Sequence, residues 1–301
     1  MIGITQISVF IFLIAGLIYS YVKREGRFAW DWAPFLILWL TYDQMRGIAD
    51  NQNHINVKPV YDLEYKIFAW MFGGQIPNEW AQSSAIQNEP TTLFFSFLYI
   101  VHPIAPLILA IYIYYGSKDK ETFKEFSHAF LLTSYLALIT FALYPVAPPW
   151  YVAENGFTQP TMLTNVAESA AGLLKADTYL GITAFANFYR DFNANPYAAV
   201  PSLHAAFSYF VAYYAIRKYK SIGPKIYLII IYPLIVWIAA VYLNHHYIVD
   251  LIIGIGYSYF SIRTIRFIHR RRREAQAKKN TEKSESPKAS KNVENLEIPT
   301  D

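Results

Sequence analysis

The chain has 301 residues, of which 54% are hydrophobic, 18% are aromatic and only 16% are charged. A soluble domain carries about 25% charged residues. The mean hydropathy here is +0.19, so the composition excludes a disordered chain, a disulfide scaffold and an ordinary water-soluble enzyme. Cysteine is absent, which removes thiolate nucleophiles and cysteine-ligated metal sites. The net charge is only +4 and the arginine run lies near the C-terminus, so no basic folded face is predicted for nucleic acid.

Segments of about 20 mostly apolar residues predict membrane-spanning helices. The first such segment lacks a basic leading region and a cleavage site, so we interpret it as a span rather than a secretory signal peptide. No internal repeat and no glycine-rich nucleotide loop is visible in the sequence. In chain order, the candidate spans are residues 4–22, 30–48, 91–115, 127–145, 199–216, 224–243 and 247–267.

Lysine and arginine in the loops predict the orientation, because these residues favour the cytoplasmic side. Alternate loops are basic, as seven spans with an external N-terminus require; six spans, with residues 4–22 at the interface, leave the same face external. That external face contains residues 49–90, residues 146–200 and the turn at His245 and His246. The basic loops hold Lys23, Arg24, Arg27, Lys118, Lys120, Lys124, Arg217, Lys218, Lys220, Lys225 and the run from Arg270 to Arg273.

The sequence therefore predicts an all-α, polytopic membrane helix bundle of six to seven spans, in four regions. Residues 1–48 form N-terminal transmembrane helices, residues 49–90 an external interfacial loop and residues 91–269 the membrane core. Residues 270–301 are polar and have no apolar face, so they are expected to form a disordered cytoplasmic tail.

The external segment 49–90 carries aromatic residues among its charges, including Trp70, Phe72 and Trp80. This mixture is typical of an amphipathic element that lies at the membrane surface. The element either covers the bundle or forms a wall for a lipid tail.

Two groups of polar residues stand at the predicted external ends of apolar spans. Pro201, Ser202 and His204 open the fifth span, where the helix N-terminus and a hydroxyl would hold a phosphate without a metal. His246 and Asp250 open the seventh span, four residues apart and so on one helix face. A carboxylate beside an imidazole fixes its tautomer and stabilises its positive charge. Taken singly, the first group is also ordinary helix capping and the second is equally a structural pair.

Together these groups resemble the second and third motifs of the type 2 phosphatidic acid phosphatase superfamily, over about residues 91–267. The sequences YPVAPPWY, ending in Trp150 and Tyr151, and NHHYIVD, ending in Asp250, resemble the branch that contains the fungal inositol phosphorylceramide synthases. Trp150 and Tyr151 are therefore candidate substrate-binding residues. The alternative interpretation of these residues is structural: the prolines end a helix, and Trp150 anchors that helix at the membrane interface.

The chain departs from the phosphatases of this superfamily in its basic residues. The position six residues before the third-motif histidine is Ala240 rather than arginine, and no lysine–arginine pair of first-motif spacing precedes Pro201. Other groups must then meet the phosphate charge. Candidates are the amides and hydroxyl at Ser202, His204 itself, Arg46 near the external end of the second span, and Arg190.

The remaining polar candidates have competing structural explanations. Arg46 could equally pair with Asp43 or Asp50, and His102 is expected to be a hydrogen-bonded core residue. His245 is a candidate substrate-binding residue that could instead lie at the rim. His54 and His128 are expected at the surface.

The resemblance implies a metal-independent double displacement with no cofactor, in a catalytic core built on six helices. His246 attacks phosphorus, Asp250 orients and charges its ring, and His204 protonates the leaving oxygen and then deprotonates the incoming hydroxyl. The expected activity is transfer of a phosphorylated, inositol-phosphate-like headgroup from a phospholipid to ceramide or diacylglycerol.

Two other functions stay open at this point. The first is a lipid phosphate phosphatase that acts on phosphatidic acid or a polyprenyl diphosphate, and the second is a transporter or scaffold with a proton relay. The expected partners are membrane lipids and not nucleic acid, and the sequence does not define an oligomeric state. The protein is expected in a membrane with its site on the external, periplasmic or lumenal face.

Overall fold

A computed structural model of the chain describes residues 28–44, 54–160, 170–193 and 195–293, together with a few isolated positions before Phe28. The first predicted span, residues 4–22, therefore lies almost entirely outside the described residues. The described part is helical and contains two isolated β-bridges. Its α-helices are α2 (Phe28–Asp43), α4 (Lys58–Phe68), α5 (Pro77–Ala81), α6 (Glu89–Val101), α7 (Ala105–Ile111), α8 (Lys120–Leu143), α9 (Pro149–Asn155), α10 (Gly172–Leu180), α11 (Ala184–Phe192), α12 (Leu203–Tyr219), α13 (Ile231–Tyr242) and α14 (Ile248–Val293).

Four helical segments among the described residues are long and apolar enough to cross a membrane. The first, Glu89–Gly116, joins α6 to α7 through a short 3₁₀ turn at His102–Ile104. Pro103 lies in that turn, and a proline has no N–H to donate to the α-helical ladder. The other three are Lys120–Leu143, Pro224–Tyr242 and Ile248–Glu282.

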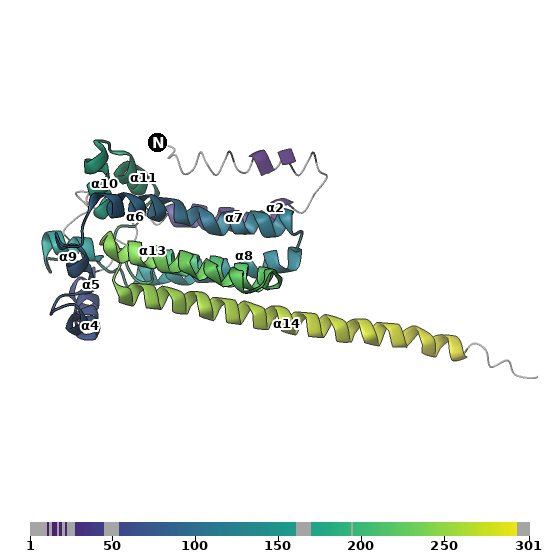
Figure 1. The fold of residues 1–301 in the computed structure, drawn as a ribbon. Coiled ribbons are helices and arrows are strands. Elements are labelled where there is room, and N and C mark those ends of the chain that lie inside the picture. The colour runs from purple at the N-terminus through teal and green to yellow at the C-terminus, as the bar shows by residue number, and fades with distance from the viewer. Residues whose placement is uncertain are drawn as a thin grey trace, which may run out of the picture.

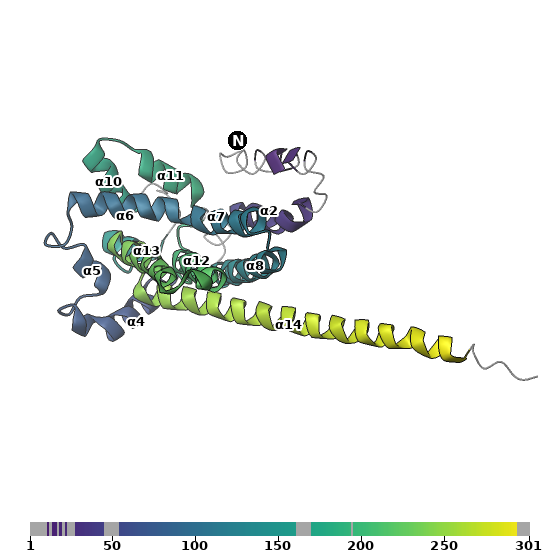
Figure 2. The same ribbon diagram turned by 45° about the vertical axis from the view of Figure 1, so that its right-hand side comes forward.

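These segments lie side by side along one axis, with α12 among them (Figures 1 and 2). The 17-residue helix α12 contacts α7, α8, α13 and α14, so it forms the centre of the bundle, while α2 packs beside α8. Large apolar side chains remain exposed on the outer helix faces, as a lipid environment allows. Examples are Phe97, Ile108, Leu143, Ile238, Ile252 and Phe260. The predicted all-α membrane bundle is thereby confirmed.

The short helices outside the membrane-spanning segments gather at one end of the bundle; they are α4, α5, α9, α10 and α11 (Figure 1). α4 and α5 contact the ends of α14 and α13, and α10 packs on α6. The described residues of the segments 54–90 and 146–200 thus share one end, as the loop charges predict. The segment 54–90 is folded rather than a loop, and its exposed Trp70 does not line the large cavity described below. It covers the bundle end and does not form a wall of that cavity.

The C-terminal segment differs from the predicted disordered tail. α14 continues as one helix from the membrane core to Val293, past the predicted boundary at residue 270 (Figure 1). Its residues from Arg270 to Glu282 are exposed. They are rich in Lys, Arg, Glu, Gln and Ala, which have high helix propensity even without an apolar face. The absence of an apolar face therefore predicted the exposure of this segment but not its backbone conformation. Residues 294–301 lie outside the described part.

Candidate active site

The first histidine of the site is positioned by the start of α12. Ser202 is the N-cap, because its Oγ accepts the N–H of Ala205 at 3.3 Å and its backbone is extended. His204 follows in the first turn, and its carbonyl accepts the hydroxyl of Ser208 at 2.8 Å. The indole N–H of Trp237 on α13 donates to the same Ser208 hydroxyl at 2.9 Å. These contacts fix the first turn of α12 against α13.

The second histidine lies in the short turn between α13 and α14. Asn244 has a φ of +64°, a left-handed conformation that asparagine adopts more readily than most residues. The N–H groups of His245 and His246 both donate to the carbonyl of Ala240, at 3.0 and 3.2 Å. Ala240, which occupies the arginine position of the related phosphatases, is fully buried. The turn places the imidazole of His246 between α12 and α14.

The rings of His204 and His246 face each other. Nδ1 of His204 lies 3.1 Å from Nε2 of His246. On the far side of the His246 ring, Nδ1 lies 3.1 Å from the carbonyl oxygen of Ala199 and 3.4 Å from Oδ2 of Asp250. Both of these oxygens accept hydrogen bonds, so the hydrogen of a neutral His246 belongs on Nδ1 and the lone pair on Nε2. The lone pair on Nε2 of His246 therefore faces Nδ1 of His204.

Asp250 is wholly buried, and it connects the start of α12 to the turn that carries His246. Its Oδ2 accepts the N–H of Tyr247 at 2.9 Å, and its backbone carbonyl accepts the N–H of Ser202 at 3.1 Å. Gly254, one turn after Asp250 in α14, lies against the start of α12. A Cβ atom at this position would lie 2.2 Å from the carbonyl oxygen of Ser202. The close approach of α12 and α14 therefore depends on this glycine.

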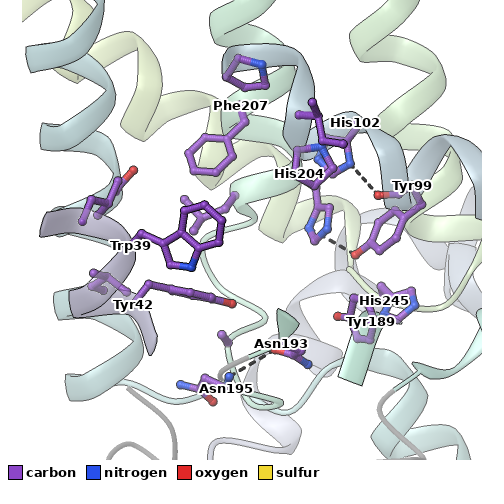
Figure 3. Close-up of a pocket in the computed structure, with 18 of the residues that line it drawn as sticks. Trp39, Tyr42, Tyr99, His102, Tyr189, Asn193, Asn195, His204, Phe207 and His245 are labelled. Carbon is purple, nitrogen blue, oxygen red and sulfur yellow. Dashed lines mark hydrogen bonds between the residues drawn. The ribbon is translucent and has the colours of Figure 1, made fainter. Parts of the chain in front are cut away.

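Tyr99 on α6 organises the other face of the histidine pair, and the motif search missed it. Its ring stacks on His204 with 4.1 Å between centroids and on His245 with 4.8 Å, both nearly parallel. Its hydroxyl lies 3.2 Å from Nδ1 of His204 (Figure 3). His102, one turn further along, holds its Nδ1 against the carbonyl of Tyr99 at 2.8 Å. Its ring centroid is 4.7 Å from that of His204.

A cavity of about 550 Å³ extends from the histidines into the bundle. Its walls come from α2, α6, α7, α8, α9, α11 and α12. Figure 3 shows Trp39 and Tyr42 of α2 across the cavity from Tyr99 and His204. The wall residues are mostly aliphatic and aromatic, which suits hydrocarbon chains. Among the described residues that line it, the titratable side chains are histidines and tyrosines, and lysine and arginine are absent. Within the described part of the chain, no cluster of three or more His, Asp or Glu side chains is arranged to hold a metal ion.

The other predicted substrate-binding residues differ in whether they line the cavity. Trp150 and His245 are buried and line the cavity. Tyr151 is also buried but points away, donating its hydroxyl to the carbonyl of Thr158 at 3.0 Å. Ser202 is buried as a helix cap and does not line the cavity. Burial lowers the pKa of His245 to about 3, so this ring is neutral at physiological pH.

Of the two predicted basic residues, the structure describes only the backbone of Arg190. Arg46 and its proposed partner Asp50 lie outside the described residues, and the side chain of Asp43 is not described. Arg190 is on α11, next to Tyr189, which lines the cavity; the side chain of Arg190 is not described. His54 and His128 are exposed, as predicted. His102 forms the predicted core hydrogen bond but also lines the cavity.

Two residues of the segment 54–90 hold the His246 turn in place, and sequence patterns did not reveal them. The carboxylate of Glu64 on α4 is fully buried and accepts the N–H groups of Ile248 and Val249, at 2.9 and 3.0 Å. It therefore caps the N-terminus of α14. The side-chain amide of Asn78 on α5 donates to the carbonyl of His246 at 3.0 Å. Burial raises the pKa of Glu64 to about 7, although its two backbone hydrogen bonds oppose the rise.

Fold and site together define an integral-membrane enzyme with two facing histidines, one backed by a buried carboxylate. Residues 75–263, more than half of the chain, match the family model of the PAP2 superfamily. The chain belongs to the PAP2 superfamily, the type 2 phosphatidic acid phosphatases and their relatives. The resemblance seen in the motifs is thereby confirmed.

Sequence relatives lie in the branch that the motifs indicate. The chain is 32% identical over 228 residues to a phosphoinositol dihydroceramide synthase of Bacteroides thetaiotaomicron, covering 74% of this chain and 72% of that protein. It is 32% identical to inositolphosphotransferase 1 and 29% identical to the catalytic subunit of inositol phosphorylceramide synthase, both of Saccharomyces cerevisiae. Those two matches span 42% of this chain and 24% and 30% of the yeast proteins. No solved structure matches the chain.

Proposed function

We propose that the protein transfers an inositol-phosphate-like headgroup from a phospholipid to the hydroxyl of a ceramide-type lipid or diacylglycerol. The observation that carries the proposal is the charge of the cavity. A phosphodiester donor carries one negative charge, whereas a phosphate monoester carries about 1.5 to 2 at neutral pH. The described lining contains histidines and tyrosines but no lysine or arginine. This low positive charge suits the single negative charge of a diester. The inositol headgroup is suggested by the names of the relatives.

In the first step, Nε2 of His246 attacks phosphorus and the bond to the glycerol oxygen of the donor breaks. His204 enters this step as an imidazolium, gives one ring proton to the departing diacylglycerol oxygen and becomes neutral. The bonds from Nδ1 of His246 to Ala199 and Asp250 stabilise the positive ring of the phosphohistidine intermediate.

In the second step, the acceptor hydroxyl gives its proton to His204 and its oxygen attacks phosphorus, which breaks the bond to Nε2 of His246. The product lipid carries the headgroup and both histidines return to their starting states. The apolar cavity holds the acceptor chains and limits the access of water, which favours the lipid hydroxyl as acceptor.

The reaction is placed on the external, periplasmic or lumenal side of the membrane, with α14 ending in the cytoplasm. The support is the alternation of basic loops, since the end of the bundle that carries the histidines has few lysines and arginines.

The test uses mass spectrometry of lipids after the purified protein meets phosphatidylinositol with ceramide and diacylglycerol, in the presence of a chelator. A new phosphoinositol lipid is expected with the wild-type protein and with His54→Ala, which changes an exposed histidine. His246→Ala and His204→Ala should abolish the product, and Asp250→Asn should reduce it strongly. Free phosphate or inositol phosphate without a new lipid would contradict transfer and favour hydrolysis.

A further inference from the structure

A second cavity, of about 200 Å³, lies at the end of the bundle opposite the histidines. It is formed between the start of α8, the last turn of α12 and the middle of α14. Charged side chains dominate its lining: Glu125, Arg217, Arg263, Arg266, Arg270 and Arg273.

The floor of this cavity is a fixed ion-pair cluster. Glu125 of α8 has only 5% of its side chain exposed and bonds to the guanidinium of Arg217 from α12. The guanidinium of Arg266 on α14 approaches the same carboxylate, with Nε 3.6 Å from Oε1, and donates to the hydroxyl of Tyr213. The carboxylate thus holds two arginines from different helices in defined positions.

The rim carries positive charge that the described acidic residues do not neutralise. Arg263 and Arg273 are exposed, and neither forms an ion pair with a described carboxylate. Arg270 pairs loosely with Glu274, at 3.8 Å between two exposed groups. Five guanidinium groups therefore surround one buried carboxylate, and the cavity attracts an anion.

The position along α14 indicates the source of that anion. Arg266 lies sixteen residues beyond Asp250 in the same helix, which at 1.5 Å per residue is about 24 Å. The hydrocarbon core of a bilayer is about 30 Å thick. With Asp250 near one membrane surface, the arginine cavity lies at the level of the opposite headgroups. Phe267, half exposed between these arginines, suits the boundary between acyl chains and headgroups.

We propose that this cavity binds the phosphate of an anionic phospholipid in the leaflet opposite the histidine site. Arginine forms paired, charge-assisted hydrogen bonds with phosphate oxygens, and a pocket whose floor is already fixed loses little entropy on binding. Because the bound headgroup contacts arginines of both α12 and α14, it stabilises the ends of these two helices opposite the histidine site. The proposal is independent of the reaction at the histidines.

The test measures binding of phosphatidylglycerol to the full-length protein in neutral detergent by native mass spectrometry, with phosphatidylcholine as the uncharged reference. Arg263→Gln/Arg273→Gln removes the two rim arginines and leaves the cluster around Glu125 intact. The matched control, Arg271→Gln/Arg272→Gln, removes the same charge from the same helix at positions that do not line the cavity. We expect affinity about tenfold weaker in the first double variant and nearly unchanged in the control.

Three results would overturn the proposal. An equal loss of affinity in both double variants would mean that phosphatidylglycerol responds to general surface charge. No loss of affinity in either variant would mean that the lipid binds elsewhere. Thermal stabilisation by inorganic phosphate as large as that by phosphatidylglycerol would make the cavity a site for soluble anions rather than for a lipid. In each case the folded state of every variant is checked by its melting temperature without added lipid.

Discussion

Tyr99 on α6 contacts His204, the ring that we propose as the general acid and base. Its hydroxyl reaches Nδ1 of His204 and its ring stacks on the imidazole. Nδ1 of His204 also faces the Nε2 lone pair of His246 at 3.1 Å, so the hydrogen of a neutral His204 belongs on Nδ1, and Nε2 takes up and releases the second proton. The stacked ring also favours the imidazolium that forms when His204 accepts a proton. Tyr99 is therefore expected to tune the acid–base function of His204.

Tyr99→Phe keeps the stacking and removes only the hydroxyl. Loss of one hydrogen bond costs about 0.5–1.5 kcal/mol, so we expect kcat to fall about threefold to tenfold with little change in melting temperature. The check is kcat and its pH profile, in which the limb assigned to His204 should shift. The matched control is Tyr112→Phe, which changes an exposed tyrosine of the same span. An unaltered pH profile in Tyr99→Phe would show that the hydroxyl only fills space.

At the scale of elements, the site depends on how closely α12 and α14 approach each other. Gly254→Ala would place a methyl group 2.2 Å from the carbonyl oxygen of Ser202, which is backbone and cannot rotate away. The helices must separate, and we expect a loss of about 1–3 kcal/mol in stability and a marked loss of kcat. Gly256→Ala is the control, because nothing lies within 4 Å of its Cβ and alanine favours a helix. Both melting temperature and kcat are measured; equal values for the two variants would contradict the role of Gly254.

α4 acts on the site through Glu64, which caps α14 from outside the bundle. Burial raises its pKa from 4.5 to about 7, so between these values the folded protein binds this proton more tightly than the unfolded chain. Stability contributed by this group therefore falls as pH rises from about 4.5 to 7. We expect Glu64→Gln to be less stable overall, since its amide nitrogen cannot accept an N–H, and to lack this pH dependence. The test measures melting temperatures across pH 4.5–8 for the wild type, Glu64→Gln and the exposed control Asp62→Asn. The same dependence of melting temperature on pH in all three proteins would contradict this role of Glu64.

At the scale of the whole molecule, the turn between α13 and α14, which contains His246, and the C-terminal end of α14 lie at opposite ends of the molecule (Figure 1). The chain has no cysteine, so single cysteines can report on each end. We expect Gln75→Cys, on the exposed turn before α5, to react with a membrane-impermeant maleimide from the external side of sealed, oriented vesicles. Ala277→Cys, exposed on α14, should react only after permeabilisation. Labelling of both from one side would contradict the proposed topology.

Features that depend on local spacing along the chain could be predicted from the amino-acid sequence. Long apolar segments predict spans because a bilayer requires about 20 apolar residues, and His246 with Asp250 predicts a shared helix face because four residues make about one turn. The family followed from the same short motifs. The described helix α14 extends further than predicted, because helix propensity in a charged segment does not require an apolar face.

Contacts between residues far apart in the chain could not be predicted and are seen first in the folded protein. Tyr99 contacts His204 across 105 positions and Glu64 contacts Ile248 across 184, and neither residue stands out in its own segment. The fold also separates Trp150, which lines the cavity, from its neighbour Tyr151, which faces away. These contacts arise from the packing of whole helices, so no local pattern in the sequence predicts them.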